Sequence, residues 1–264
     1  MQLLRMQINP GIYRVINDLL VISRLINPGR GGADRHNASW FSNNTSKETG
    51  MALKIYGIAA SRALRPLWMA SELGLTYEHV KTDYRAGESR TGSFLALNPN
   101  GHVPVVVDER AEGVVTVWES MACALYLARH HGRADGVNAV PATVDEDAAA
   151  LRWAFWVVNE VEADALTVLA HRRTMPEDRR KPELADRAAG RLLAPLRVLE
   201  QHLSAQPERG QDYLAAARFT VADLCVASVL MWLRAARSVP EECPKVQAWL
   251  EACLARPAYR AVRG

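Results

Sequence analysis

The sequence of 264 residues contains few cysteines and no long apolar run. Its four cysteines are Cys123, Cys225, Cys243 and Cys253, and no two of them form a CxxC pair. This pattern excludes a disulfide scaffold, a zinc knuckle and a dithiol redox motif. A run of about 18 uncharged apolar residues is also lacking, which excludes a transmembrane helix. The remaining composition is that of an ordinary globular protein, long enough for two domains.

The sequence has little excess charge, and the excess is unevenly placed. Lysine and arginine number 32 against 29 acidic residues, a net charge of +3. Residues 1–50 hold six basic and three acidic side chains, whereas residues 51–264 hold 26 of each. The body is therefore neutral by formal count. We expect neither a nucleic-acid partner nor a membrane partner, because either would favour clustered basic charge.

Residues 1–50 differ in composition from the rest of the chain. They hold six of the ten asparagines, and the change ends at Met51. Three interpretations compete: an amphipathic targeting helix, a disordered extension, or a start assigned too early, with Met51 as the true first residue. We favour the last. A secretory signal is excluded because Arg14, Asp18 and Arg24 interrupt any apolar core segment.

The first part of the body has the pattern of a small α/β domain. Its order of elements, β-α-β-α-β-β-α, places the first two strands in parallel around a helix and the last two in a hairpin with its loop at 108–113. The expected strands span 53–57, 77–81, 103–107 and 114–118, and the expected helices span 61–73, 91–97 and 120–131.

After Pro141 only helical periodicity remains, over 145–171, 182–206, 220–237 and 244–255. The sequence thus predicts an α/β domain at 51–133, a linker at 134–142 and an all-helical domain at 143–264.

The start of one helix is specified in detail by Phe219-Thr220-Val221-Ala222-Asp223-Leu224. Thr220 fits an N-cap and Asp223 the third helical position, so the two side chains form a capping box. Phe219 and Leu224 fit the flanking hydrophobic contact. We interpret Thr220 and Asp223 as structural.

Together, Asn98-Pro99-Asn100-Gly101-His102-Val103-Pro104, Glu119-Ser120 and the capping motif resemble the glutathione transferases. The resemblance extends from residue 51 to about residue 262 and leaves residues 1–50 without a counterpart. It implies a thioredoxin-like N-terminal domain followed by an all-helical C-terminal domain. It also implies a cytoplasmic, homodimeric detoxification enzyme with glutathione as co-substrate and no metal.

Glu119-Ser120 stands where a strand ends and a helix begins. The free amides of a helix N-terminus suit a carboxylate, Ser120 adds a hydroxyl donor, and Glu119 offers a counter-charge for an amine. The γ-glutamyl end of glutathione needs all three. The alternative is that Ser120 only caps its helix.

By the same resemblance, Val103-Pro104 corresponds to a cis-proline turn that presents the Val103 backbone to an extended peptide. A trans proline opening an edge strand is the alternative. His102 stands where the family often places a cation near the glycyl carboxylate, and it could equally be a solvated loop histidine.

Ser61 is the predicted donor to the glutathione thiolate. Ser61 and Arg65 have the Ser-x-x-x-Arg spacing of the serine-type classes, similar to theta and delta. A hydroxyl near a helix N-terminus favours a thiolate. A plain N-cap is the alternative for Ser61, and Arg62 either assists by charge or is solvated. No cysteine lies in this segment, and Tyr56 is too early for a tyrosine-type site.

Trp153 and Trp156 are three residues apart on the first long helix of the second domain. They either line a pocket for an apolar electrophile or belong to the core.

The function predicted is conjugation of the glutathione thiolate to a small apolar electrophile. Alternatives on the same scaffold are a glutathione-dependent isomerase, dehalogenase or peroxidase, or a non-catalytic binding or regulatory protein.

Overall fold

The computed structural model describes residues 52–132 and 139–263. The interpretations of residues 1–50 and most of the linker expected at 134–142 lie outside these ranges. The residues described here belong to one compact unit, Thr49–Gly264.

A four-stranded sheet forms the base of the α/β half, with the strand order β2-β1-β3-β4. As expected, β1 is parallel to β2, and β3 and β4 form a hairpin. The central pair β1 and β3 is antiparallel. The bounds are Leu53–Tyr56 for β1, Glu78–Val80 for β2, Val105–Arg110 for β3 and Gly113–Trp118 for β4.

The prediction of a hairpin loop at 108–113 is wrong. The hairpin ladder continues through Glu109, which pairs with Val114, to Arg110, which pairs with Gly113. Only a two-residue turn therefore remains between the strands. Charged residues at 108–110 hid this extension from a reading based on apolar runs.

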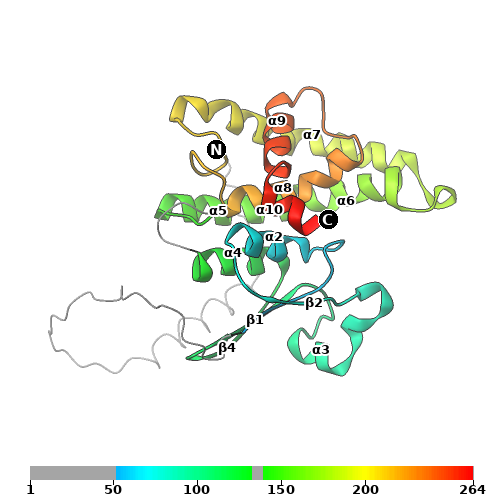
Figure 1. Ribbon diagram of the computed structural model, residues 1–264. Coiled ribbons are helices and arrows are strands. Elements are labelled where there is room, and N and C mark those ends of the chain that lie inside the picture. The colour runs from blue at the N-terminus through cyan, green and yellow to red at the C-terminus, as the bar shows by residue number, and fades with distance from the viewer. Residues whose placement is uncertain (1–51, 133–138, 264) are drawn as a thin grey trace, which may run out of the picture. The chain divides into compact units, whose positions relative to one another are not determined.

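Helices cover both faces of the sheet (Figure 1). Val105 and Val107 of β3 pack with Phe94 of α3 (Gly92–Leu97), whereas Val106 between them belongs to the main core on the opposite face. That main-core face carries α2 (Leu64–Glu72) and α4 (Ser120–His131), which also contact the helical half. Because successive side chains of β3 point to opposite faces of the sheet, this one strand contributes to two separate apolar clusters.

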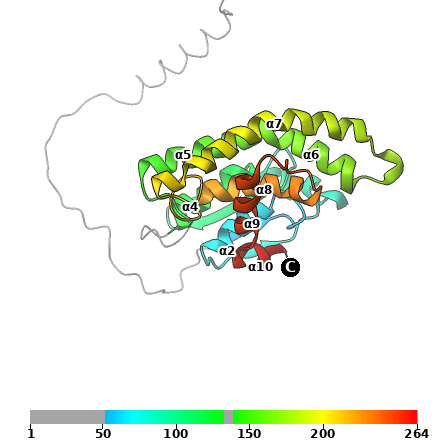
Figure 2. The same cartoon turned by 90° about the horizontal axis from the view of Figure 1, so that it is seen from above.

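In the helical half, one long stretch runs through two π-helical segments, and α7 returns along it (Figure 2). The stretch replaces the single helix expected at 145–171. It comprises α5 (Val144–Trp156), the π-helical Val157–Glu162, α6 (Ala163–Leu169) and the π-helical Ala170–Thr174. The α-helices that follow in the described residues are α7 (Pro182–Ala205), α8 (Val221–Ala235), α9 (Pro244–Leu254) and α10 (Pro257–Arg263). The last was not predicted from the sequence.

The two halves share one apolar core. Trp68 of α2 is fully buried and contacts the rings of Phe219 and Tyr259 at centroid distances of 5.7 and 4.9 Å. Arg256 binds Glu72 of α2 through two hydrogen bonds of 2.7 Å. Among the described helices, none has the length and apolar character needed to cross a membrane.

The capping box of α8 is present and does more than cap. The Asp223 carboxylate accepts the Thr220 N–H at 2.9 Å, and it also accepts the Leu214 N–H and the Trp249 indole N–H at 2.9 and 3.0 Å. Burial raises the pKa of Asp223, and these donors oppose that shift. One side chain thus ties the segment before α8 to α9.

Candidate active site

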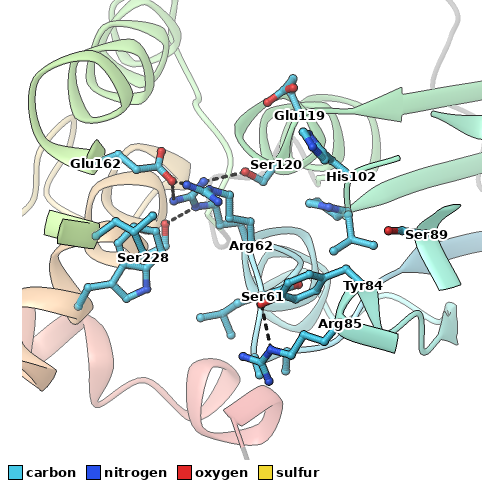
Figure 3. A pocket seen from close by; sticks show the side chains of 18 of the residues that line it. Ser61, Arg62, Tyr84, Arg85, Ser89, His102, Glu119, Ser120, Glu162 and Ser228 are labelled. Atoms are coloured by element: carbon cyan, nitrogen blue, oxygen red, sulfur yellow. Dashed lines mark hydrogen bonds and ion pairs between the residues drawn. The ribbon is translucent and has the colours of Figure 1, made fainter. Parts of the chain in front are cut away.

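A cleft of about 840 Å³ lies between the α/β half and the helical half (Figure 3). Every residue predicted for catalysis or glutathione binding lines it. These are Ser61, His102, Val103, Pro104, Glu119 and Ser120. They come from three separate segments, which the sheet and its helices bring together.

The sequence predicted that Ser61 begins the first helix, and this is wrong. The helix α2 begins at Leu64, and Ser61 lies in the turn before it. Its hydroxyl donates to the Ile58 carbonyl at 2.7 Å and accepts the Ala63 N–H at 3.1 Å. The side chain therefore stabilises the turn, while the N-cap position of α2 belongs to Ala63. Rotation about its Cβ–Oγ bond would redirect the hydrogen to a bound ligand.

Gly57 brings the Ser61 turn close to the next segment of the cleft. Its φ of +128° is a conformation that L side chains rarely adopt. A Cβ at this position would lie 2.6 Å from the Cβ of Ala63 and 3.2 Å from the Cβ of Val103. The chain leaving β1 therefore contacts both segments, which only a glycine allows.

The Val103–Pro104 peptide bond is cis, as the resemblance implied. Buried Asn98 organises the loop before it, donating to the His102 carbonyl at 2.8 Å and accepting the Asn100 N–H at 3.0 Å. The His102 side chain is exposed at the rim of the cleft. The Arg90 guanidinium, which the sequence had not indicated, packs on this loop and donates to the Asn100 carbonyl.

Glu119 and Ser120 lie where β4 leads into α4. Glu119 is exposed and has a φ of 71°, whereas Ser120 is buried and is the first residue of the helix. The two side chains therefore lie side by side in the chain, with one open to solvent and the other inside the cleft.

A buried polar cluster behind Ser120 escaped the sequence analysis. Arg65 of α2 donates to Ser120 Oγ at 2.7 Å, to Glu162 Oε1 at 2.8 Å and to Ser228 Oγ at 2.9 Å. Arg62 donates to the same Glu162 oxygen at 2.7 Å, so it is neither free nor merely solvated. In the sequence, Arg65 stands out only by its spacing from Ser61. Glu162 and Ser228 carry no local signal at all.

This cluster holds more positive than negative charge. Burial by itself raises the pKa of Glu162, but the charges and hydrogen bonds of Arg65 and Arg62 outweigh burial and hold that pKa below its ordinary value. Glu162 is therefore ionised at neutral pH. Because two guanidinium groups share its one carboxylate, the cluster carries a formal charge of +1 beside Ser61 and Ser120.

The helical half contributes an apolar wall to the cleft, beside the polar side chains of Glu162, Thr174, Ser228 and Arg263. This apolar wall is formed by Val158, Leu166, Leu169, Met231 and Trp232. Arg62 and Arg65 lie over the Trp232 ring at 5.7 and 5.8 Å from its centroid. Such a surface can bind the apolar part of a small molecule.

Trp153 and Trp156 do not line this cleft, which corrects the pocket interpretation in favour of the core. Trp153 is 4% exposed, and its ring packs against Trp156 and against His202 of α7. Their shared face therefore points at a neighbouring helix. Phe155, between them in sequence, lies on another face and is 65% exposed.

A second, more apolar cavity of about 550 Å³ adjoins the cleft along α4 and α5. Leu125, Leu151 and Phe155 contribute to its lining. Arg62, Arg65, Glu119, Ser120, Val158 and Glu162 line both cavities.

The four cysteines are buried and unpaired. Burial raises the pKa of Cys123 and of Cys225 to about 12, so both stay protonated thiols at neutral pH. None of the four lines the cleft.

Comparison with known proteins agrees with this architecture. The glutathione S-transferase N-terminal domain matches residues 51–129, and the glutathione S-transferase C-terminal domain matches residues 162–257. Glutathione S-transferase 3 of Zea mays is 33% identical over 220 residues, which cover 79% of this chain and 91% of that protein. Glutathione S-transferase GstB of Escherichia coli is 28% identical, with coverage of 72% and 87%.

Solved structures show the same fold. Glutathione transferase F7 of Populus trichocarpa is 27% identical, with a TM-score of 0.68 over 80% of this chain and 98% of that chain. A theta class glutathione S-transferase of Xanthomonas axonopodis, solved with glutathione bound, is also 27% identical, with a TM-score of 0.68 over 80% and 97%. This chain therefore belongs to the glutathione S-transferase family of enzymes.

Proposed function

We propose that this protein conjugates the thiolate of glutathione to a small electrophile with an apolar body. One observation supports this most directly: Ser61, the cis Val103–Pro104 bond and Glu119-Ser120 line the same cleft, facing an apolar wall. The relative from Xanthomonas axonopodis, with glutathione bound, adds support. The proposal includes a cytoplasmic detoxification role.

Each polar group of glutathione has a matching group in the cleft. The γ-glutamyl carboxylate takes the Ser120 hydroxyl and the amides at the start of α4, where the helix dipole favours an anion. Glu119 pairs with the ammonium group. The Val103 backbone binds the cysteinyl segment as an added strand. Arg90 offers positive charge, and His102 a ring N–H, to the glycyl carboxylate.

Ser61 makes the sulfur reactive. A free thiol has a pKa of about 8.5, so most of it is protonated at neutral pH. When the Ser61 hydroxyl turns from the Ile58 carbonyl to the sulfur, it donates a hydrogen bond that favours the thiolate. The positive cluster of Arg62, Arg65 and Glu162 acts in the same direction. The thiol proton leaves to water, and the thiolate attacks the electrophilic carbon held against the apolar wall. With an aryl halide, the new C–S bond replaces the carbon–halogen bond and the halide leaves.

We also propose that a second copy of the chain covers the apolar cavity along α4 and α5, giving a homodimer. The exposed Phe155 ring and the apolar side chains of Leu125 and Leu151 support this, because such a surface favours a partner over water.

The experiment measures retention on immobilised glutathione and conjugation of an aryl halide, for wild type and Ser61→Ala. We expect wild type to be retained and active, and Ser61→Ala to be retained but slower by about a hundredfold in kcat, the usual effect of losing one donor to a developing anion. Ser204→Ala, on the exposed side of α7, is the matched control and keeps full activity.

Two other outcomes would contradict parts of the proposal. Retention of wild type without turnover on aryl halides, peroxides or haloalkanes would support a non-catalytic glutathione-binding protein. Unchanged turnover in Ser61→Ala would contradict the role of Ser61.

A further inference from the structure

The cleft carries an excess of positive charge. Among the described residues that line it, five arginines stand against two glutamates, a formal excess of three. The arginines are Arg62, Arg65, Arg85, Arg90 and Arg263, and the glutamates are Glu119 and Glu162. Glutathione with an ionised thiol has two carboxylates, a thiolate and an ammonium group, a net charge of about −2. Bound glutathione would therefore leave part of the positive charge without a counter-charge.

Two of these arginines lie over the apolar wall, and one of the two is open to the cleft. Arg62 and Arg65 lie over the Trp232 ring, at 5.7 and 5.8 Å from its centroid. The Arg65 side chain is 2% exposed, and each of its three nitrogens already donates to a neighbouring side chain. The Arg62 side chain is 46% exposed. A molecule bound at the wall therefore meets Arg62.

Arg62 has hydrogen-bond donors to spare. Its side chain runs from the Ser61 turn to Glu162 (Figure 3). Its Nε donates to Glu162 Oε1 at 2.7 Å, and the side chain makes no other hydrogen bond within residues 52–132 and 139–263. Both Nη nitrogens thus keep their N–H groups for a ligand. Two Nη groups beside an aromatic ring suit a carboxylate joined to an apolar body that packs on that ring.

The charge of Arg62 is not cancelled by Glu162. The same carboxylate oxygen accepts from Arg62 and from Arg65, so two guanidinium groups share one negative charge. Arg85, the next arginine around the cleft mouth, is exposed and contacts the Tyr84 side chain without an ion pair to any residue that the structure describes. An anion entering the cleft is therefore attracted and meets no nearby carboxylate at the Nη groups of Arg62.

We infer that the electrophile carries a carboxylate on its apolar body, and that Arg62 binds this carboxylate through its Nη groups while the body packs on the apolar wall. This inference deepens the proposed function and rests on it, because the electrophile needs the glutathione thiolate as its nucleophile. In the proposed function, the two carboxylates of glutathione have partners at the start of α4 and at Arg90. Arg62 is thus left for the second substrate, as a residue that determines specificity.

The test compares two aryl chlorides that differ in one group. One is a chlorodinitrobenzoate with its carboxylate para to the chlorine, and the other is the corresponding neutral benzamide. In both, the thiolate of glutathione displaces chloride. Each kcat/KM is divided by the rate constant of the same reaction without protein, which removes the difference in intrinsic reactivity. We expect wild type to prefer the benzoate about tenfold on this scale, equivalent to about 1.4 kcal/mol, the size of a charge-assisted hydrogen bond at a partly exposed site.

Arg62→Gln should abolish this preference, because glutamine has neither the charge nor the paired donors of a guanidinium. Rates with both substrates should also fall by a common factor, since Arg62 adds to the positive charge beside the thiolate. The ratio between the substrates cancels that shared loss. Arg62→Lys keeps the charge without the paired donors and should retain a preference of about threefold. Equal losses on the two substrates, which a role on the thiolate alone predicts, would overturn the inference.

Arg152→Gln is the matched control. Arg152 also lies over a tryptophan ring, 5.8 Å from the centroid of Trp153, but it does not line the cleft. The substitution changes the net charge of the protein by the same amount as Arg62→Gln. It should leave the preference for the benzoate unchanged. If it lowers the preference as much as Arg62→Gln does, the overall charge of the protein is responsible and the inference is wrong.

Wild type alone also separates this inference from the proposed function. If it conjugates the benzamide as well as the benzoate, or conjugates other electrophiles but neither of these two, the inference fails and the proposed function stands. If it binds glutathione without turnover on any electrophile, the proposed function fails and the inference fails with it.

Discussion

Removing one partner of the buried Arg65–Glu162 ion pair should be among the most destabilising single substitutions in this protein. The change to test is Glu162→Gln, which keeps the shape and the accepting oxygen but removes the charge. The Arg65 side chain is 2% exposed and the Glu162 side chain 8%, so water cannot replace the lost carboxylate. Arg62 contributes less, because its side chain is 46% exposed and can be solvated.

The magnitude follows from this burial. Breaking a buried pair by removing one partner costs about 3–5 kcal/mol, because the remaining charge is left unpaired. We expect about 3 kcal/mol, since the glutamine oxygen still accepts one hydrogen bond. The control is Asp164→Asn, which breaks the pair with Arg191 on the surface of α6 and α7. Its arginine is 61% exposed. That loss should stay below about 1 kcal/mol.

The assay is urea unfolding followed by tryptophan fluorescence, at neutral pH and again in acid. The pKa of Glu162 in the fold lies below its ordinary value of 4.5. The unfolded chain therefore binds the proton first, and the stability from Glu162 is lost as the pH falls below 4.5 through the folded pKa. The difference in unfolding free energy between wild type and Glu162→Gln should therefore become smaller in acid than at neutral pH. Equal losses for Glu162→Gln and Asp164→Asn at neutral pH would refute the reasoning.

Two further predictions concern the backbone and the chain's first residues. Gly57→Ala should cost at least about 2 kcal/mol of unfolding free energy, because it combines positive φ with a close contact, whereas Gly190→Ala on α7, with no atom within 4 Å, should gain about 0.5–1 kcal/mol. Equal effects in chemical denaturation would contradict this. A chain beginning at Met51 should keep the unfolding midpoint and glutathione retention of the full chain, since the family match begins at residue 51. Loss of either would assign residues 1–50 a structural or functional role.

Local patterns predicted the elements that local chemistry determines. The helix beginning at Ser120, the capping box of Thr220 and Asp223, the parallel pair β1 and β2 and the hairpin of β3 and β4 all follow from periodicity and turn signals in the sequence. The antiparallel pairing of β1 with β3 was not predicted. The short helix Pro257–Arg263 has too little periodicity to be recognised alone, and it is held by packing on α2.

The residues of the candidate site also fall into two groups, those that belong to local sequence motifs and those that only packing brings together. Ser61, Val103-Pro104 and Glu119-Ser120 belong to local motifs, and the sequence placed them in one site. Arg65 and Glu162 are 97 residues apart, and their contact depends on how α2 packs against the helical half. Trp153 and Trp156 share a helical face, but only packing decides which neighbour that face meets. Contacts of this kind exist only in the folded chain.

The close approach at Gly57 also has an evolutionary consequence. It fixes the backbone on which the Ser61 turn and Val103 depend, because a Cβ at Gly57 would collide with Ala63 and press on Val103. The apolar wall comes from other helices, through Val158, Leu166 and Trp232, none of which contacts Gly57 in this way. Under the proposed function, mutations in the wall would change the electrophile accepted, while the segment around Gly57 and Ser61 stays constant. The fold separates what must be conserved from what is free to diverge.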